Sequence, residues 1–289
     1  MIRAADVSKL REATQASVMD CKKALEETEG NFDKALEVIK REGLLKADKK
    51  SGHTTEAGNI EAKLNEDNTK GALLELRSNT SFVSQSEEFR TLTQNLVEQV
   101  LTNSNVDITP EKLLAMSFLK DSSTTVADVL KVNIAKFGEN IEIGNCAYME
   151  TREGLVEAYI HNGGRVGVLL SLETDKKEIV KTEEFKNLAH NLAMHIAAMN
   201  PKYISQENVP ANILEAKKAA ITKELVEANK PQDLLEKIAT GKLNDWKKEI
   251  CLLDQIYIKD PSLKIIDWFA KEAEKNGKIS VSKFIRFQA

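Results

Sequence analysis

Residues 71–102 read GALLELRSNTSFVSQSEEFRTLTQNLVEQVLT, and residues 167–198 read GVLLSLETDKKEIVKTEEFKNLAHNLAMHIAA. The two stretches align without a gap at a spacing of 96 residues, with ten identities in 32 positions. The identities fall in an apolar run, which predicts a strand, and in an amphipathic segment, which predicts a helix. In the first copy they are Gly71, Leu73, Leu74, Leu76, Glu87, Glu88, Phe89, Leu92, Asn95 and Leu96. The sequence therefore predicts one strand–loop–helix unit that the chain uses twice.

The loop inside this unit is where the two copies differ. The first copy carries Thr80, Ser81, Phe82 and Val83, and the second carries KKEI at residues 176–179. An aromatic side chain that is absent from the matching loop is either a contact for a partner or a buried anchor of its own loop. The four residues of the first loop are therefore the main candidate for a binding site.

The composition limits the classes of protein to which the chain can belong. Its 289 residues suffice for two or three small domains, and 42% hydrophobic with 30% charged residues is typical of a helix-rich globular protein. A net charge of -4 argues against a general nucleic-acid binder, which usually carries a basic excess. No apolar run approaches the roughly 20 residues of a membrane helix, and the first residues lack the apolar core of a secretion signal.

The cysteines indicate a reducing compartment. Cys21, Cys146 and Cys251 lie far apart and form no CxxC motif. This pattern fits reduced thiols better than a disulfide framework. We therefore expect a cytoplasmic protein that binds neither nucleic acid nor a membrane.

Three short helices are expected within residues 4–43. Ser17 stands where a helix N-cap is preferred, and Gly30 is expected to end that helix as its left-handed C′ residue. Asn31 is the expected N-cap of the third helix, which is expected to end at Gly43. Such a bundle is small, and we interpret it as a docking module. The polar residues that follow it are expected to form a tether.

The rest of the chain is expected to form a duplicated core and a projecting helical hairpin. Strands near residues 141–148, 155–160 and 166–172 are expected to form a three-stranded meander. Two charged helices at residues 211–247, interrupted at Pro231, predict an antiparallel hairpin, which is either a solvated structural element or a contact for a partner. The other expected elements are strands at 60–65, 72–76 and 279–287 and helices at 110–119, 126–137, 183–199 and 261–276.

These elements define the expected fold class, which is α+β. It combines an N-terminal three-helix bundle, a duplicated core of antiparallel sheet plus helices, and a helical hairpin protrusion. The expected units are residues 1–46 (N-terminal module), 47–58 (linker), 59–139 and 140–205 (the two core subdomains), 206–250 (hairpin) and 251–289 (C-terminal helix and strand).

A search for catalytic, metal-binding and nucleotide-binding motifs finds none. His190 and His195 are separated by about 140° around a helix and are poorly placed to share a metal. The chain contains no GxSxG nucleophile motif, glycine-rich dinucleotide motif or GxxxxGK phosphate loop. We therefore expect no catalytic residue, metal or cofactor, although residues distant in sequence can assemble a site. The residues favour an interaction protein over an enzyme.

Several motifs resemble the bacterial translation elongation factor Ts family. Residues 10–14, LREAT, and 18–25, VMDCKKAL, are similar to the opening of that family, as is GLLKADKK at 43–50. The TSFV loop looks like the family's Thr-Asp-Phe-Val motif. Further matches are GRVGVL at 164–169, MHIAA at 194–198 and FIRF at 284–287. The resemblance runs in order over essentially the whole chain.

The resemblance implies a guanine-nucleotide exchange factor for elongation factor Tu. In that family a ubiquitin-associated-like N-terminal bundle docks on the GTPase domain of Tu. The loop aromatic, here Phe82, wedges between helices of the GTPase and displaces the segment that organises Mg²⁺, so that GDP leaves and GTP can bind. This role needs no nucleotide site on the exchange factor, and the complex is either one-to-one or two-to-two, the latter with a homodimer of this chain.

The resemblance also assigns further partner-binding residues. Arg11, Val18, Met19 and Lys22 would lie on the face of the N-terminal module that meets the GTPase, although Met19 has a second interpretation as a core residue. His161 corresponds to a partner-contacting histidine in a core loop, with the adjacent asparagine, Asn162, as the alternative.

The chain departs from the family at one position of the loop. Ser81 stands where the family has aspartate, so the motif lacks a carboxylate. We expect the wedge to survive through Phe82, with its electrostatic or capping contribution weakened. A different class of function remains as the alternative: a ubiquitin-like or nascent-chain-binding adaptor that acts through the N-terminal helical module alone.

Overall fold

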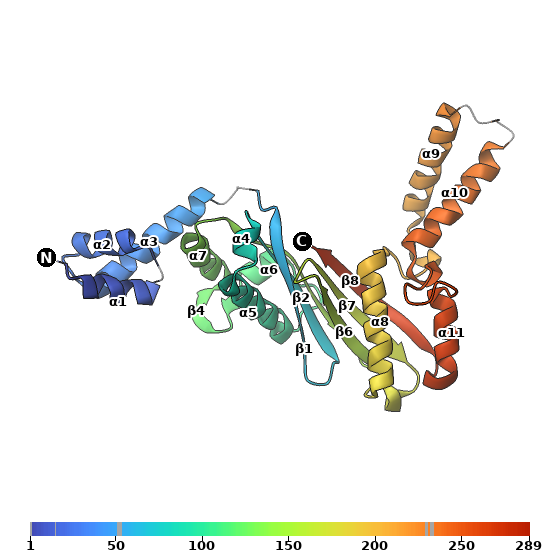
Figure 1. The fold of residues 1–289 in the computed structure, drawn as a ribbon, viewed down its shortest axis with the longest axis horizontal. Helices are drawn as coiled ribbons and strands as arrows, with labels where there is room; N and C mark the ends of the chain where they lie inside the picture. The colour runs from blue at the N-terminus through green and yellow to red at the C-terminus, as the bar shows by residue number, and fades with distance from the viewer. Residues whose placement is uncertain (1, 15, 51–53, 229–230, 232–233) are drawn as a thin grey trace.

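The computed structural model describes residues 2–14, 16–50, 54–228, 231 and 234–289. It is an α+β protein with antiparallel sheets, as predicted. A helical bundle lies at the N-terminal end of an elongated molecule, two three-stranded sheets with flanking helices form its middle, and a helical hairpin projects near the far end (Figure 1).

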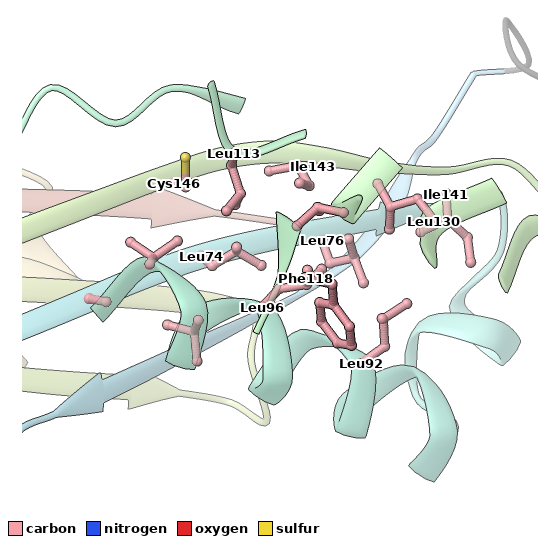
Figure 2. Packing of buried hydrophobic residues seen from close by; sticks show 14 of the residues in the cluster. Leu74, Leu76, Leu92, Leu96, Leu113, Phe118, Leu130, Ile141, Ile143 and Cys146 are labelled. Carbon is pink, nitrogen blue, oxygen red and sulfur yellow. The ribbon is translucent and has the colours of Figure 1, made fainter. Parts of the chain in front are cut away.

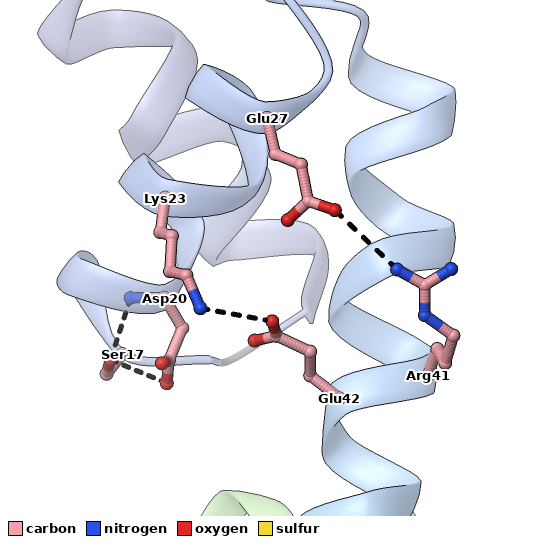
Figure 3. Close-up of polar contacts among 6 residues, drawn as sticks. All are labelled: Ser17, Asp20, Lys23, Glu27, Arg41 and Glu42. Atoms are coloured by element: carbon pink, nitrogen blue, oxygen red, sulfur yellow. Dashed lines mark hydrogen bonds and ion pairs between the residues drawn. The ribbon is translucent and has the colours of Figure 1, made fainter.

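Three helices form the N-terminal bundle: α1 (Ala4–Thr14), α2 (Val18–Glu27) and α3 (Phe32–Lys50). The predicted caps are present, since Ser17 Oγ accepts the Asp20 N–H at 3.1 Å and Asn31 Oδ1 accepts the Lys34 N–H at 3.0 Å. Two surface ion pairs, Lys23–Glu42 and Glu27–Arg41, join α2 to α3 (Figure 3). The buried core of the bundle consists of Leu10, Cys21, Ala24, Leu25, Ala35, Val38 and Ile39.

Of the two predicted helix ends in this bundle, the one at Gly30 is displaced by one residue and the one at Gly43 is wrong. Glu29, with φ of 54°, is the left-handed C′ residue of α2, and Gly30 follows it at C″ and donates its N–H to Leu25 O at 2.8 Å. Gly43 does not end α3, because the helix formers around it outweigh a cost of about 1 kcal/mol for one internal glycine. The predicted tether at 47–58 is correspondingly too long: α3 reaches Lys50, the next strand begins at Ala57, and residues 51–53 lie outside the described residues.

The first sheet has the strand order β1-β2-β5 and is antiparallel. Its strands are β1 (Ala57–Leu64), β2 (Lys70–Ser78) and β5 (Ile141–Glu150), and the helices that pack on it are α5 (Glu87–Asn103), α6 (Pro110–Leu114) and α7 (Val126–Phe137). Figure 2 shows Leu74 and Leu76 of β2 packed against Leu92 and Leu96 of α5 in the resulting core. The same helix also packs on β1, where Lys63 pairs with Glu98 of α5 at 2.9 Å.

The helix predicted at 110–119 is wrong in its second half. It stops at Leu114, and two short strands follow, β3 (Ser117–Phe118) and β4 (Asp121–Thr125). This small hairpin buries the Phe118 ring in the first core, which a continued helix would not place there.

The second sheet has the strand order β6-β7-β8 and is also antiparallel. It contains β6 (Gly154–His161), β7 (Val166–Thr174) and β8 (Ile279–Gln288), with α8 (Glu183–Met199) and α11 (Ile265–Asn276) packed on it. The predicted meander of β5, β6 and β7 is therefore wrong. Four of the buried side chains of β5 belong to the first core, namely Ile141, Ile143, Cys146 and Tyr148. Strand β8, from the far end of the sequence, takes the third place beside β7.

The two sheets pack face to face through a small apolar layer. Its buried members are Ile60, Leu73, Met149, Val156 and Leu169. Gly71 and Gly167 lie at this contact: a Cβ on Gly71 would come within 2.7 Å of Leu169, and one on Gly167 within 2.4 Å of Ile60. A side chain at either glycine would displace the buried residues between the two halves, so the repeated glycine favours their close approach.

The internal repeat predicted from the sequence is confirmed. Strands β2 and β7, and helices α5 and α8, begin and end at positions 96 residues apart. Ser86 and Thr182 are the equivalent N-caps, and Ser104 and Asn200 are the equivalent left-handed C-caps. Both sheets carry a bulge at the same place, between Glu75 and Leu76 in one and the matching pair in the other.

The predicted helical hairpin is also confirmed. Helices α9 (Ala211–Glu227) and α10 (Leu235–Ile250) pack together through Ile221, Leu225 and Ala239, and Lys242 pairs with Glu224 at 3.2 Å. The hairpin projects from the second half (Figure 1). Short 3₁₀ segments, η2 (Gln206–Asn208) and η3 (Leu252–Asp254), lie at its base.

Candidate partner-binding surface

The aromatic of the predicted loop lies on a single helical turn, α4 (Ser81–Ser84). Val83 is buried and packs in the first core, whereas Phe82 is 87% exposed. The alternative that Phe82 is a buried anchor is therefore wrong, because Val83 is the anchor of this turn. An exposed phenylalanine on an anchored turn is a feature expected of a contact residue.

Hydrogen bonds fix this turn to the end of α7. Thr80 is the N-cap: its Oγ1 accepts the Val83 N–H and donates to Oε1 of Glu139 at 2.8 Å. The Thr80 N–H donates to Oε2 of the same carboxylate at 3.0 Å. Because Thr80 supplies the cap, the expected weakening of the capping by Ser81 is wrong. Only the electrostatic part of that expectation remains.

The matching turn of the second half is a 3₁₀ turn that lacks both the aromatic and, among the described residues, a side-chain cap. It is η1 (Lys177–Ile179), in which Glu178 occupies the place of Phe82 and is exposed. Ile179 occupies the place of Val83 and packs against the second core. The scaffold of the repeat therefore accounts for Val83 and Ile179 but not for the Phe82 ring.

The four candidate residues of the N-terminal module are all exposed. Arg11, Val18 and Lys22 line a groove between α1 and α2 with a volume of about 430 Å³. Met19 follows Val18 on α2 and is 72% exposed, so its interpretation as a core residue is wrong. The groove combines apolar surface with two cationic side chains, which suits a partner that presents apolar and acidic groups.

His161 lies at the exposed end of β6 and is hydrogen-bonded to a tyrosine. Its Nδ1 is 2.9 Å from the Tyr159 hydroxyl. The Tyr159 ring meets His190 edge-on at 5.5 Å, and His190 Nδ1 lies 2.8 Å from a carboxylate oxygen of Glu157. Burial raises the pKa of Glu157, and His190 opposes this shift. Asn162 is exposed as well, so the choice between His161 and Asn162 stays a prediction.

The structure brings the two core loops together. A hollow with a volume of about 140 Å³ lies between α4 and the β6–β7 turn. Ser81 lines one side of this hollow, and Asn162 and Gly163 line the other. The candidate residues of the two core loops therefore flank one continuous surface.

The described residues show no assembled centre for metal chemistry. Within the parts of the chain that the structure describes, no three or more His, Cys, Asp or Glu side chains are arranged to hold a metal ion. Cys146 and Cys251 are buried, and burial raises the pKa of each thiol to about 11, which disfavours the reactive thiolate. No described helix is both long enough and apolar enough to span a membrane.

Two residues that support the candidate site escaped the sequence analysis. Glu139 holds the TSFV turn from 59 positions away, and no local pattern marks that pairing. Tyr159 precedes His161 by two residues on one strand, and strand alternation places the two side chains on the same face. The two-residue spacing to His161 therefore identifies Tyr159 from the sequence, whereas no pattern in the sequence identifies Glu139.

The duplicated scaffold, the exposed aromatic turn and the two further candidate surfaces define a protein-binding factor. The family model described as Elongation factor TS matches residues 79–289. The chain belongs to the elongation factor Ts family.

Individual relatives extend the match to the whole chain. A protein named elongation factor Ts from Clostridium acetobutylicum is 37% identical, covering 100% of this chain and 92% of its own length. Its namesake from Aquifex aeolicus is also 37% identical, over 98% of this chain and 96% of its own length. The protein of that name from Nostoc sp. is 37% identical over 97% of this chain and 90% of its own length.

Proposed function

We propose that the protein is a guanine-nucleotide exchange factor for elongation factor Tu in translation elongation. Membership of the elongation factor Ts family supports this function. The observation that carries the residue-level proposal is Phe82, which is 87% exposed on a turn anchored by Val83 and Thr80. A ring held in solvent in this way can enter a partner without reordering its own backbone.

The proposed mechanism is mechanical and electrostatic. Phe82 enters between helices of the GTPase and displaces the segment that organises Mg²⁺ beside GDP. Loss of the cation removes positive charge from beside the phosphates, and GDP dissociates faster. Linkage requires that the factor bind nucleotide-free Tu more tightly than it binds the GDP complex, so that nucleotide in turn releases the factor.

The other candidate residues are proposed as additional contacts. Arg11, Val18, Met19 and Lys22 would dock the N-terminal bundle, which we propose to be ubiquitin-associated-like, on the GTPase domain. His161, or Asn162 beside it, would contact Tu from the core. Contacts spread over several modules hold the factor in place while the wedge acts.

In this proposal the protein promotes exchange by binding, without making or breaking a covalent bond. It binds no nucleotide itself, works in the cytoplasm, and forms either a one-to-one complex or a two-to-two complex that includes a homodimer. The proposed units are an N-terminal module, a two-part core whose second part includes the C-terminal helix and strand, and the hairpin. The adaptor alternative is not favoured, because the relatives match the chain over its whole length and not over the N-terminal module alone.

Release of a fluorescent GDP analogue from the cognate Tu tests the function. The wild-type protein should accelerate release, and Phe82→Ala should reduce that acceleration by about 30-fold or more, as expected for a contact worth at least 2 kcal/mol. Glu178→Ala, at the matching position of the second half, is the control and should retain full activity. If the wild-type protein leaves the release rate unchanged, the proposed function is wrong. Equal activity of Phe82→Ala and wild type would refute the role of the ring.

A further inference from the structure

The hollow between α4 and the β6–β7 turn holds polar groups for which the exchange mechanism above has no use. Its lining comes from both halves of the core, with Asn59 from β1, Arg90 from α5 and Arg165 from the β6–β7 turn. Ser81 of α4 and Gly163 of the β6–β7 turn also line the hollow, from opposite sides. The hollow thus exists only where the two halves meet.

Two arginines, Arg90 and Arg165, lie at this hollow. Within the described ranges, neither Arg90 nor Arg165 donates a side-chain hydrogen bond or forms an ion pair. The Arg90 guanidinium reaches across from α5 toward the turn, since its Nη2 lies 3.8 Å from where a Cβ on Gly163 would be. Glu61 interacts electrostatically with Arg90 but makes no ion pair with it. The hollow therefore presents two guanidinium groups that are available to an anion.

A buried oxygen at the same hollow has no hydrogen-bond partner among the residues that the structure describes. Asn59 is 3% exposed, and its Nδ2 donates to Gly163 O at 3.2 Å. That hydrogen bond fixes the orientation of the amide and leaves Oδ1 with no donor among the described residues. A buried acceptor without a donor is uncommon and destabilising. The site therefore calls for a ligand that carries a hydrogen-bond donor as well as a negative charge.

Size and chemistry narrow the choice of ligand. A volume of about 140 Å³ is well below the roughly 300–1,000 Å³ of pockets that enclose small molecules of nucleotide size. The dianion of a phosphate ester would fit the arginines, but its ionised oxygens are all acceptors and offer no donor to Asn59 Oδ1. A carboxylate fits paired guanidinium groups, and the chain that bears it supplies N–H donors.

We propose that this hollow receives an acidic side chain of the GTPase partner, with its carboxylate between Arg90 and Arg165 and an N–H of its chain on Asn59 Oδ1. The inference rests on the proposed function, because a partner that contacts both Phe82 and the His161 loop has to cover the hollow between them. Arg90 and Arg165 are then determinants of partner specificity that act separately from the wedge.

The test measures the affinity of nucleotide-free Tu for the full-length protein at several salt concentrations. The double variant Arg90→Gln/Arg165→Gln should bind at least about tenfold more weakly and with a shallower salt dependence, because it lacks two charge-assisted contacts. The control Arg152→Gln/Lys271→Gln makes the same change in net charge with exposed residues that do not line the hollow, and it should bind as the wild type does. Thermal unfolding of both variants should match that of the wild type.

The outcomes separate this inference from the function on which it rests. If the wild type accelerates GDP release and the double variant binds as tightly as the control, the inference is wrong and the function stands. If the wild type neither binds Tu nor accelerates release, both fail. Inorganic phosphate is the competing probe: saturable phosphate binding that the double variant loses, with unchanged Tu affinity, would make the hollow an anion site and overturn the proposal. Recovery of Arg165→Glu binding by an acid-to-lysine change in Tu would support it.

Discussion

Gln99 and His195 occupy equivalent positions in the two repeats, and each anchors a later segment of the chain against its helix. Gln99 donates to Ser117 O at 2.7 Å and accepts the Leu119 N–H at 2.8 Å. His195 donates from Nε2 to Gln255 Oε1 at 3.0 Å and accepts the Ile258 N–H on Nδ1 at 3.3 Å. In the first half the anchor is the amide of Gln99, which does not titrate. In the second half it is the imidazole of His195, which does.

This difference predicts that acid destabilises the second half through His195. Burial lowers the pKa of His195, and protonation of Nδ1 would remove its acceptor. The unfolded chain therefore binds the proton on His195 more readily than the folded chain does. The contribution of His195 to the free energy of unfolding is fully present above a pH of about 6.5. It falls as the pH drops toward the lower pKa of the folded state. The loss from this one group is at most about 1.4 kcal/mol per pH unit.

Chemical denaturation at pH 7.5 and 5.5 measures this loss. His195→Gln copies the chemistry of Gln99, so its free energy of unfolding should change less between the two pH values than that of the wild type. An equal change in both proteins would assign the acid sensitivity to other groups.

Two hydrogen bonds from Thr80 to the Glu139 carboxylate form a clamp on the TSFV turn. Loss of this clamp is expected to impair exchange even when Phe82 is present. Glu139→Ala removes both acceptors of Thr80 while leaving Phe82 in place. We expect GDP release to be accelerated about three- to tenfold less than by the wild type, because the ring is no longer held in one position. Thr80 is exposed and Glu139 is only half-buried, so the melting temperature should change little. A variant with full exchange activity would show that the turn needs no clamp.

Met19 is expected to contribute to affinity and not to stability. It is 72% exposed, so Met19→Ala removes almost no buried surface from the free protein. We expect about tenfold weaker binding to Tu, measured by calorimetry, with an unchanged melting temperature. Lys34→Ala, an exposed change on α3, is the matched control within the same bundle. A lowered melting temperature without loss of affinity would contradict this assignment.

The Tyr159 hydroxyl is expected to orient His161. Tyr159→Phe removes the hydrogen bond to Nδ1 but keeps the edge contact with His190. If His161 contacts Tu, affinity should fall by about two- to tenfold, as for loss of one hydrogen bond. His161→Ala should cost at least as much, and the double variant should cost no more than His161→Ala alone. Additive losses would show that Tyr159 acts independently of His161.

Replacement of Glu75, at the bulge of the first sheet, is expected to destabilise the protein. Its side chain is fully buried and accepts from Arg77 Nε at 2.7 Å and Nη2 at 3.0 Å, with Asn145 as a further donor. Glu75→Gln should lower the free energy of unfolding by about 2 kcal/mol, because it removes the charge that Arg77 faces. Ser171→Ala, at the matching position of the second half, should cost less, about 1 kcal/mol or below. Denaturant titration measures both, and equal values would refute the special role of the charge.

Local patterns and the internal repeat made much of the fold predictable. The N-caps at Ser17 and Asn31 follow from side chains that bond to neighbouring backbone, and both are present. Comparison of the two copies singled out Phe82, because a residue that the scaffold needs would recur at position 178. Its exposure agrees with that inference.

The errors concern relationships that no local pattern contains. Strand β5 was grouped with β6 by proximity in sequence, but its pairing with β2 depends on which core its side chains fill. Gly43 was expected to end a helix, because the sequence does not show how strongly its neighbours favour continuing it. The hollow between Arg90 and Arg165 joins residues of two halves, and only the packing of the sheets brings them together.

The strand order has a consequence for the order in which the protein can fold during synthesis. The first sheet is complete when β5 has emerged at residue 150, whereas the second waits for β8, which ends at residue 288. At about 5–20 residues per second, those 138 residues (288 − 150) take the ribosome roughly 7 to 28 s. During that interval one edge of β7 has no partner and is a site for wrong pairing. The first half can therefore serve as a folded platform on which the second half later closes.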